Sequence, residues 1–177
     1  MNSSAACLLL VTLGLVLISQ FPVATHARGY PDTLVSQICK ETSEMDNCMK
    51  LLTAAGPSIV NAKDFTELSK AVLTLALNKG VEAQNFLKGL AQIQNSTALT
   101  QCANFYYNGM VGTFRSALGE ITAGAQTANY DVSVAVDGPV FCGNLLASEK
   151  INNPAIDAIN QEMMLLSSVS DSVTSRL

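Results

Sequence analysis

The amino-acid sequence predicts an all-α protein: an antiparallel four-helix bundle that follows a short N-terminal helical hairpin and contains two disulfides. Four long segments between about residues 63 and 175 carry apolar residues at the spacing of an α-helix. A shorter unit at about residues 31–55 shows the same spacing, and polar, Gly or Pro residues separate the segments. An even number of cysteines in the mature chain indicates the disulfides.

Residues 1–27 are predicted to be a secretory signal peptide. The chain from Cys7 to Ser19 is apolar or small, and this run is too short to span a bilayer. Phe21-Pro22 ends the run, and small residues lead to Ala27, after which we expect cleavage. The mature chain, residues 28–177, is long enough for one domain with its own core, and no later segment is apolar enough to be a membrane span.

Removal of the signal peptide leaves few means of catalysis. It takes away Cys7 and His26, which is the only histidine of the chain. Neither a Ser-His-Asp triad nor a Cys-His pair can then form, and no glycine-rich phosphate loop is present. Paired carboxylates remain possible in principle, but scattered surface acids usually serve solubility. We therefore expect a protein that is not an enzyme, without metal or cofactor.

The charge of the chain gives no reason to propose nucleic acid as a partner. Ten Lys and Arg residues stand against 14 Asp and Glu residues, for a formal net charge of -4. The two signs are interspersed along the mature chain, which is typical of a solvated surface.

The hairpin at about residues 31–55 is predicted from two short apolar faces. Pro31 suits the first turn of a helix, and the face behind it contains Leu34, Val35 and Ile38. A second short helix includes Cys48, Leu51 and Leu52. Gly56-Pro57 is predicted to end the unit, because Gly is a common helix terminator and Pro cannot continue a helix.

The first two bundle helices have clear start signals. The first opens at Asp64, with Glu67 three residues later, a pattern typical of a capped helix. Its predicted apolar face is Phe65, Leu68, Val72, Leu75, Phe86, Leu87, Leu90 and Ile93. The second starts near Ser96, and its predicted apolar face is Leu99, Cys102, Tyr106, Met110, Phe114, Leu118 and Ile121.

The third segment, about residues 127–148, is ambiguous in its pattern. Residues 131–136 alternate like a strand, and Gly138-Pro139 interrupts a helix. A single strand would have no partner, so a kinked helix is predicted.

The fourth helix begins at Asn153-Pro154, and its predicted core residues are Ile156, Ile159, Met163, Leu166, Val169 and Val173. The Met163-Met164 pair is interpreted as core filling.

The four remaining cysteines, Cys39, Cys48, Cys102 and Cys142, are predicted to form two disulfides. Eight residues separate the first two, and thirty-nine separate the last two. A zinc site usually has closer ligand pairs and often His, and the mature chain has neither. Four cysteines allow three connectivities. If neighbours along the chain pair, loop entropy predicts contributions of about 2.7 and about 3.9 kcal/mol.

The cysteine motifs resemble those of a known family. Residues 38–42, Ile-Cys-Lys-Glu-Thr, and 48–52, Cys-Met-Lys-Leu-Leu, resemble the opening motif of the plant invertase and pectin methylesterase inhibitor family. Cys102 with Tyr106 is similar to the third Cys of the family and the Tyr one turn later. Ser133-Val134-Ala135 stands ahead of Cys142, where members often carry Ser-Ala-Ala. The resemblance covers nearly the whole mature chain.

This resemblance implies that residues 28–177 form a pectin methylesterase/invertase inhibitor domain, with Cys39 bonded to Cys48 and Cys102 to Cys142. It also implies a plant protein that inhibits a secreted carbohydrate-active enzyme by non-covalent, stoichiometric binding. Three departures from the family pattern leave the target open. Met45 replaces a common Pro, Phe141 replaces a frequent Thr, and Gly143-Asn144 replaces an acidic pair.

The loop between the second and third bundle helices favours pectin methylesterase as the partner. Invertase inhibitors of the family resemble one another in a Pro-Lys-Phe motif there, whose cation meets the acidic sugar-binding cleft. This chain has Gly-Ala-Gln-Thr-Ala-Asn at residues 124–129, without a Lys. We expect a face of the bundle to cover the pectin groove, and the candidate exposed polar contacts are Gln84, Lys88, Gln92, Asn108 and Arg115. The alternatives are an inhibitor of cell-wall or vacuolar acid invertase and a protein of this fold without inhibitory activity.

The predicted secretion leads to two further expectations, one for localisation and one for N-glycosylation. The signal peptide indicates an extracellular protein of the apoplast and cell wall, and the resemblance leaves the vacuole as an alternative. Asn95-Ser96-Thr97 is an N-glycosylation sequon at a predicted break between helices, so Asn95 is a candidate glycosylation site. The other interpretation is that Ser96 only caps the following helix.

Overall fold

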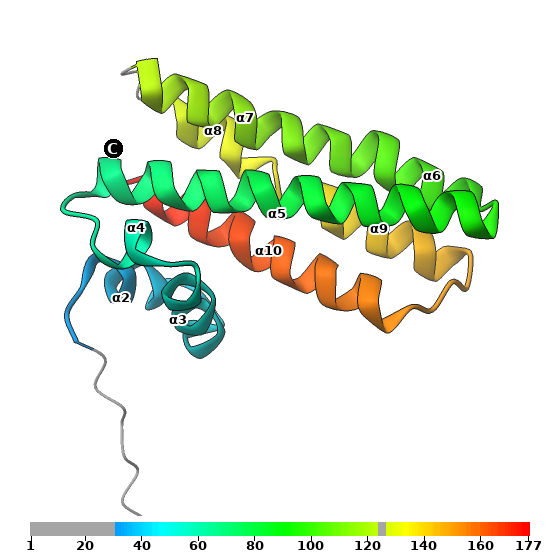
Figure 1. The fold of residues 1–177 in the computed structure, drawn as a ribbon, viewed down its shortest axis with the longest axis horizontal. Helices are drawn as coiled ribbons and strands as arrows, with labels where there is room; N and C mark the ends of the chain where they lie inside the picture. Colours follow the sequence, from blue (N-terminus) through cyan, green and yellow to red (C-terminus); the bar gives the residue numbers. More distant parts are fainter. Residues whose placement is uncertain (1–30, 124–126) are drawn as a thin grey trace, which may run out of the picture. The chain divides into compact units, whose positions relative to one another are not determined.

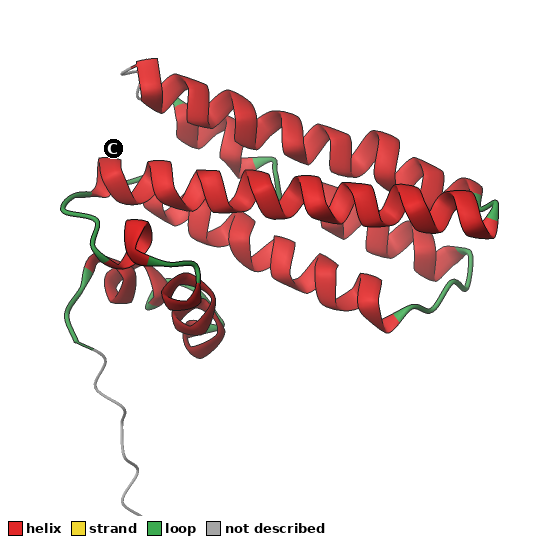
Figure 2. Ribbon diagram, in the orientation of Figure 1, coloured by secondary structure: helices red, strands yellow, loops and turns green. Residues whose placement is uncertain are grey.

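The protein is represented by a computed structural model that describes residues 31–123 and 127–177. The predicted signal peptide, residues 1–27, and its cleavage site lie outside the described residues. Within those ranges the chain forms helices and loops without a strand (Figure 2). The prediction of an all-α fold with two disulfides is confirmed.

The N-terminal hairpin consists of α2 (Leu34–Cys39) and α3 (Met45–Ala54). Thr33 begins it with a reciprocal cap: its Oγ1 accepts from the Ser36 N–H at 3.1 Å, and Ser36 Oγ accepts from the Thr33 N–H at 3.0 Å. A short helix, α4 (Pro57–Val60), follows where the sequence predicts only an end. Gly56 turns the chain with a φ of 110°, and Pro57 then occupies the first position of α4, where its missing N–H needs no partner.

The first bundle helix is α5 (Phe65–Gln94), and its predicted start is confirmed. Asp64 Oδ1 accepts from the Glu67 N–H at 2.8 Å, while Glu67 Oε2 accepts from the Lys63 N–H at 2.9 Å. The second bundle helix is built from α6 (Thr97–Gln101), the π-helix η2 (Cys102–Tyr106) and α7 (Tyr107–Ala123). Ser96 caps its start by accepting from the Leu99 N–H at 3.2 Å.

The third bundle helix is divided into α8 (Ala128–Ser133) and α9 (Asp137–Ser148). The prediction of a broken helix rather than a strand is confirmed, but the position of the break is corrected. The chain leaves the helix at residues 134–136, and Gly138-Pro139 lies inside the first turn of α9. Pro is tolerated there because the first turn does not require its N–H. The fourth helix, α10 (Pro154–Thr174), begins as predicted, with Asn153 as its cap.

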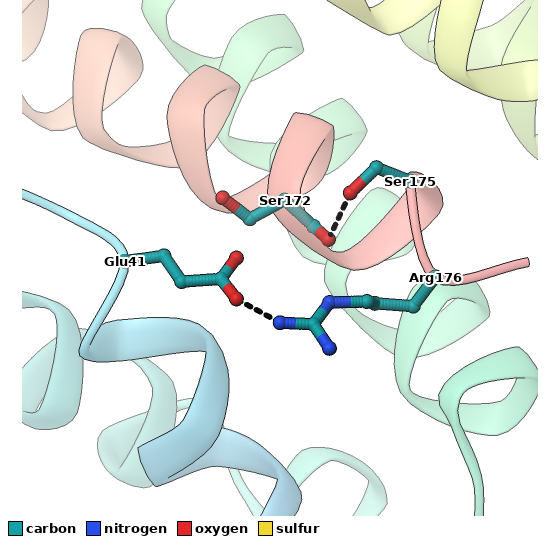
Figure 3. A network of polar contacts seen from close by, with 4 residues as sticks. All are labelled: Glu41, Ser172, Ser175 and Arg176. Carbon is teal, nitrogen blue, oxygen red and sulfur yellow. Dashed lines mark hydrogen bonds and ion pairs between the residues drawn. The ribbon is translucent and has the colours of Figure 1, made fainter.

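The long helices α5, α7, α9 and α10 run alongside one another in alternating directions, which is the predicted antiparallel bundle (Figure 1). The hairpin lies at the end of the bundle where α5 begins and α10 finishes. Its turn is tied to the bundle by an ion pair between Glu41 and Arg176 (Figure 3). The Arg176 guanidinium also lies 5.6 Å from the centre of the Phe65 ring. Ser175 Oγ donates to the Ser172 carbonyl oxygen at 2.8 Å in the same group (Figure 3).

Most of the predicted core residues face the interior, and Phe114, Leu166 and Leu87 are among the largest fully buried side chains. Two predictions for α5 are wrong: Phe86 is 38% exposed and Ile93 is 82% exposed. Successive helical residues point about 100° apart, so once Leu87 faces the core, Phe86 beside it turns outward. Met163 fills the core, as predicted, while Met164 is only half-buried.

Candidate interaction surface

The cysteine and metal-ligand chemistry of the described residues is limited. All four cysteines are in disulfides, Cys39 with Cys48 and Cys102 with Cys142, so the pairing implied by the resemblance is confirmed. A disulfide sulfur is not a thiolate nucleophile. No cluster of three or more His, Cys, Asp or Glu side chains suited to a metal ion occurs in residues 31–123 and 127–177.

The same described ranges contain no helix with the length and apolar character needed to cross a membrane.

The π-helix η2 determines which side chains of the second bundle helix face outward. The Tyr107 N–H donates to the Cys102 carbonyl oxygen, five residues earlier, so one more residue fits into this turn than in an α-helix. As a result Tyr107, not the predicted Tyr106, lies in the core behind Cys102. Tyr106 is half-buried at the edge, and Phe105 is turned out to solvent.

Gln84 supports this π-helix from inside the protein. It was expected to be an exposed contact residue, but it is only 7% exposed, so that prediction is wrong. Its Nε2 donates to the Ala103 carbonyl oxygen at 2.9 Å and to Asn108 Oδ1 at 3.2 Å. The signal was present in the sequence: Gln84 lies four residues after Gly80 and three before Leu87, on the face of α5 that packs against the bundle.

The other predicted contact residues lie on α5 and α7, which pack against each other. Gln92, Asn108 and Arg115 are exposed, and Lys88 is half-buried. Lys88 and Gln92 border a polar hollow of about 360 Å³ where α5 ends beside α6 and η2. We call the side of the bundle that carries Lys88, Gln92, Asn108 and Arg115 the polar face. The residues that line the hollow are Lys88, Ala91, Gln92, Asn95, Thr100, Ala103 and Asn104.

A second surface feature, the aromatic groove, lies between η2 with the start of α7 and the start of α9. It has a volume of about 510 Å³ and is lined by Phe105, Tyr106, Gly109, Met110, Thr113, Val134, Asp137, Gly138 and Phe141. The Tyr106 ring contacts Phe105 at 5.3 Å and Phe141 at 5.8 Å between ring centres. Phe105 is 69% exposed and Phe141 is 47% exposed. Exposed aromatic residues gathered in one patch are more typical of an interaction site than single exposed apolar residues are.

Two local features bring the walls of the aromatic groove together. The Cys102–Cys142 disulfide joins η2 to α9 with a Cα–Cα distance of 4.9 Å. Gly138 permits the close approach, because a Cβ there would lie 2.8 Å from Met110 Cβ and 3.0 Å from the Tyr106 carbonyl oxygen. Sequence reasoning identified Phe141 only as a departure from the family pattern and missed Phe105. The two lie 36 positions apart in the chain, so no local pattern connects them.

The loop between α7 and α8, where the Pro-Lys-Phe motif of invertase inhibitors is expected, is described only in part. Residues 124–126 lie outside the described residues. In the part that follows, the Asn129 side chain is hydrogen-bonded to α10: its Nδ2 donates to Asp171 Oδ1 at 3.0 Å and to Thr174 Oγ1 at 3.3 Å. The loop therefore returns into the bundle at Asn129.

Comparison with known proteins identifies the family. No curated protein matches the chain. The fold is similar to that of mutant form A of a pectin methylesterase inhibitor from Arabidopsis, with a TM-score of 0.71, 18% identity, and coverage of 81% of this chain and 96% of that chain. It is also similar to a pectin methylesterase inhibitor from Arabidopsis thaliana, with a TM-score of 0.60, 17% identity, and coverage of 84% and 98%. The family described as plant invertase/pectin methylesterase inhibitor matches residues 33–173, and the chain therefore belongs to this family.

Proposed function

We propose that this protein is a secreted inhibitor of plant pectin methylesterase that binds the enzyme non-covalently in a one-to-one complex and covers its pectin groove. The observation that carries the proposal is the match to the inhibitor family over residues 33–173. The site of action is the cell wall and apoplast, which the predicted signal peptide of residues 1–27 supports.

The choice of methylesterase over invertase rests on the loop between α7 and α8. Residues 124–129 carry no Lys and no Pro-Lys-Phe triplet, so the loop offers no cation to the carboxylates of an invertase cleft. The bond from Asn129 to Asp171 further holds the end of this loop against α10. The net charge of -4 suits a partner whose groove binds an acidic polysaccharide, because such a groove is expected to carry cations.

The proposal is tested by titrating the oxidised, secreted protein against a plant pectin methylesterase and a plant acid invertase in parallel. We expect methylesterase activity to fall and to saturate near one inhibitor per enzyme, with invertase activity unchanged. Inhibition of invertase alone would contradict the choice of target, because it would make the Pro-Lys-Phe motif dispensable. A folded protein that inhibits neither enzyme would favour a family member without inhibitory activity.

A further inference from the structure

We propose that the aromatic groove is the central contact of the enzyme-binding surface, and that it receives an apolar side chain of the enzyme beside a Lys or Arg that pairs with Asp137. This inference rests on the proposed function and adds to it the place and the chemistry of the contact.

The shape of the groove supports a protein side chain as the occupant. Phe105, Tyr106 and Phe141 form its aromatic wall, and Val134 is a further large apolar residue of the lining that is exposed. Clustered aromatic residues of this kind supply much of the energy at the centre of protein interfaces. A hollow of about 510 Å³ between them is large enough to receive one or two side chains.

The walls of the groove are held in place before binding. Phe141 directly precedes Cys142, whose disulfide to Cys102 fixes α9 against η2. Phe105 and Tyr106 belong to η2, which is hydrogen-bonded to Gln84 of α5 through the Ala103 carbonyl oxygen. A site that is ordered in advance loses less side-chain freedom on binding, which favours affinity.

The charge at the groove favours a cationic neighbour over a sugar acid. Asp137 is the charged residue of the lining, and no Lys or Arg is among the residues that line the groove. A uronate of pectin would be repelled by this carboxylate. The stem of a Lys or Arg can instead lie along the aromatic rings while its charged end reaches Asp137.

The aromatic groove and the polar hollow are lined by adjacent residues of η2, Phe105 and Asn104. Asn104 and Asn108, on either side of Phe105 and Tyr106 in the same helix, are exposed, and Asn104 lines the polar hollow. The combination is therefore an apolar centre with a polar margin, which is the usual anatomy of a protein interface. Phe141 stands where family members often carry Thr, so the groove is expected to adjust the choice of target in this chain.

The experiment measures the affinity of a plant pectin methylesterase for the wild-type protein and a set of single variants. We expect Phe105→Ala and Phe141→Thr to weaken binding about 10- to 100-fold, and Asp137→Asn to weaken it about 3- to 10-fold. The matched controls are Tyr130→Ser, an exposed aromatic residue of α8 outside the groove, and Asp131→Asn, an acidic residue of α8. Both controls are expected to bind within about twofold of the wild type. Circular dichroism and thermal unfolding verify that each variant is folded.

The outcomes separate the failure of this inference from the failure of the proposed function. Groove variants that bind as tightly as the wild type would overturn the inference and leave the inhibitor function intact. Equal weakening by the controls would also overturn it, because the effect would then belong to the surface in general. A wild-type protein that binds no methylesterase contradicts the proposed function, and this inference with it. Binding of a methyl-esterified oligogalacturonide that is lost in Phe105→Ala would assign the groove to a sugar and overturn the protein occupant.

Discussion

Tyr107 and Asn160 join the second and fourth bundle helices by a hydrogen bond in the core. The Tyr107 hydroxyl donates to Asn160 Oδ1 at 2.6 Å, and both side chains are buried. Burial raises the pKa of Tyr107 well above its usual value, because the phenolate would lose its hydration in the interior. The hydrogen bond therefore joins the buried faces of the two helices with a neutral phenol as its donor.

Replacement of this tyrosine is predicted to lower stability and to change its response to alkali. Tyr107→Phe leaves Asn160 Oδ1 without its donor, which is expected to cost about 1–2 kcal/mol at neutral pH. In the wild type the folded pKa lies above the unfolded value of about 10, so the stability from the neutral phenol is complete below about pH 10 and is lost as pH rises further. Urea unfolding between pH 7 and 11, with the disulfides verified intact, measures both effects. A variant that loses stability above pH 10 as steeply as the wild type would contradict this assignment.

Asn95 is proposed to be glycosylated when the protein is secreted. The residue is exposed, ends α5 in the left-handed conformation with a φ of 49°, and is followed by an exposed Thr97. We expect the secreted protein to lose mass on glycosidase treatment. Thr97→Ala is expected to abolish this loss and Thr97→Ser to retain it, since the second keeps the sequon and both leave the backbone of Asn95 unchanged. Equal masses before and after glycosidase treatment of the wild type would refute the proposal.

At the scale of the elements, the packing of α9 against η2 and α7 depends on a glycine, Gly138, which has no side chain. Gly138 lies in the first turn of α9, and a Cβ there would be 2.8 Å from Met110 Cβ. Met110 Cβ is fixed to the helix backbone, so this contact can be relieved only by a shift of one helix. The aromatic groove lies at this same contact, and its walls would move apart.

Gly138→Ala is therefore predicted to destabilise the protein by about 1–3 kcal/mol, as over-packing does. Gly112→Ala is the matched control: Gly112 lies inside α7 with no atom within 4 Å of the added Cβ. That variant is expected to gain up to about 1 kcal/mol, because Ala is the better helix former. Chemical denaturation measures both values. Equal changes in the two variants would show that helix propensity, and not the approach of α9, decides the result.

At the scale of the whole molecule, the two disulfides close loops of different length. Cys39–Cys48 closes a separation of 9 residues inside the hairpin, and Cys102–Cys142 closes a separation of 40 between two bundle helices. Neither disulfide connects the hairpin to the bundle. The ion pair of Glu41 with Arg176 does, but both side chains are about 40% exposed and water weakens the pair.

Removal of the longer disulfide is predicted to cost more stability than removal of the shorter one. Loop entropy gives about 3.9 kcal/mol for the Cys102→Ala, Cys142→Ala double variant and about 2.7 kcal/mol for Cys39→Ala, Cys48→Ala. Urea denaturation of both double variants beside the wild type gives the comparison. A larger loss from the hairpin pair would show that native contacts of the hairpin outweigh loop length.

The sequence alone determined the helices, most of their ends and the disulfide chemistry. Helical periodicity and caps such as Asp64, Ser96 and Asn153 depend on residues within a few positions of one another. The cysteine motifs, read by resemblance, led to the pairing of Cys39 with Cys48 and Cys102 with Cys142. The helices and their caps follow from local geometry, whereas the pairing of Cys102 with Cys142, 40 positions apart, was implied only by the resemblance to the family.

Only the tertiary structure decided which residues face outward around Cys102. The π-helix moves Tyr107 into the core in place of Tyr106, and its position depends on packing against α5, where Gln84 donates to it. The aromatic groove likewise joins Phe105 and Phe141, which are distant in the chain and meet because α9 lies against η2. One residue added to a helical turn rotates every later side chain by about 100°, and the energy that selects this register comes from neighbouring helices. The candidate surface therefore follows from packing between helices, which the order of residues within one helix does not specify.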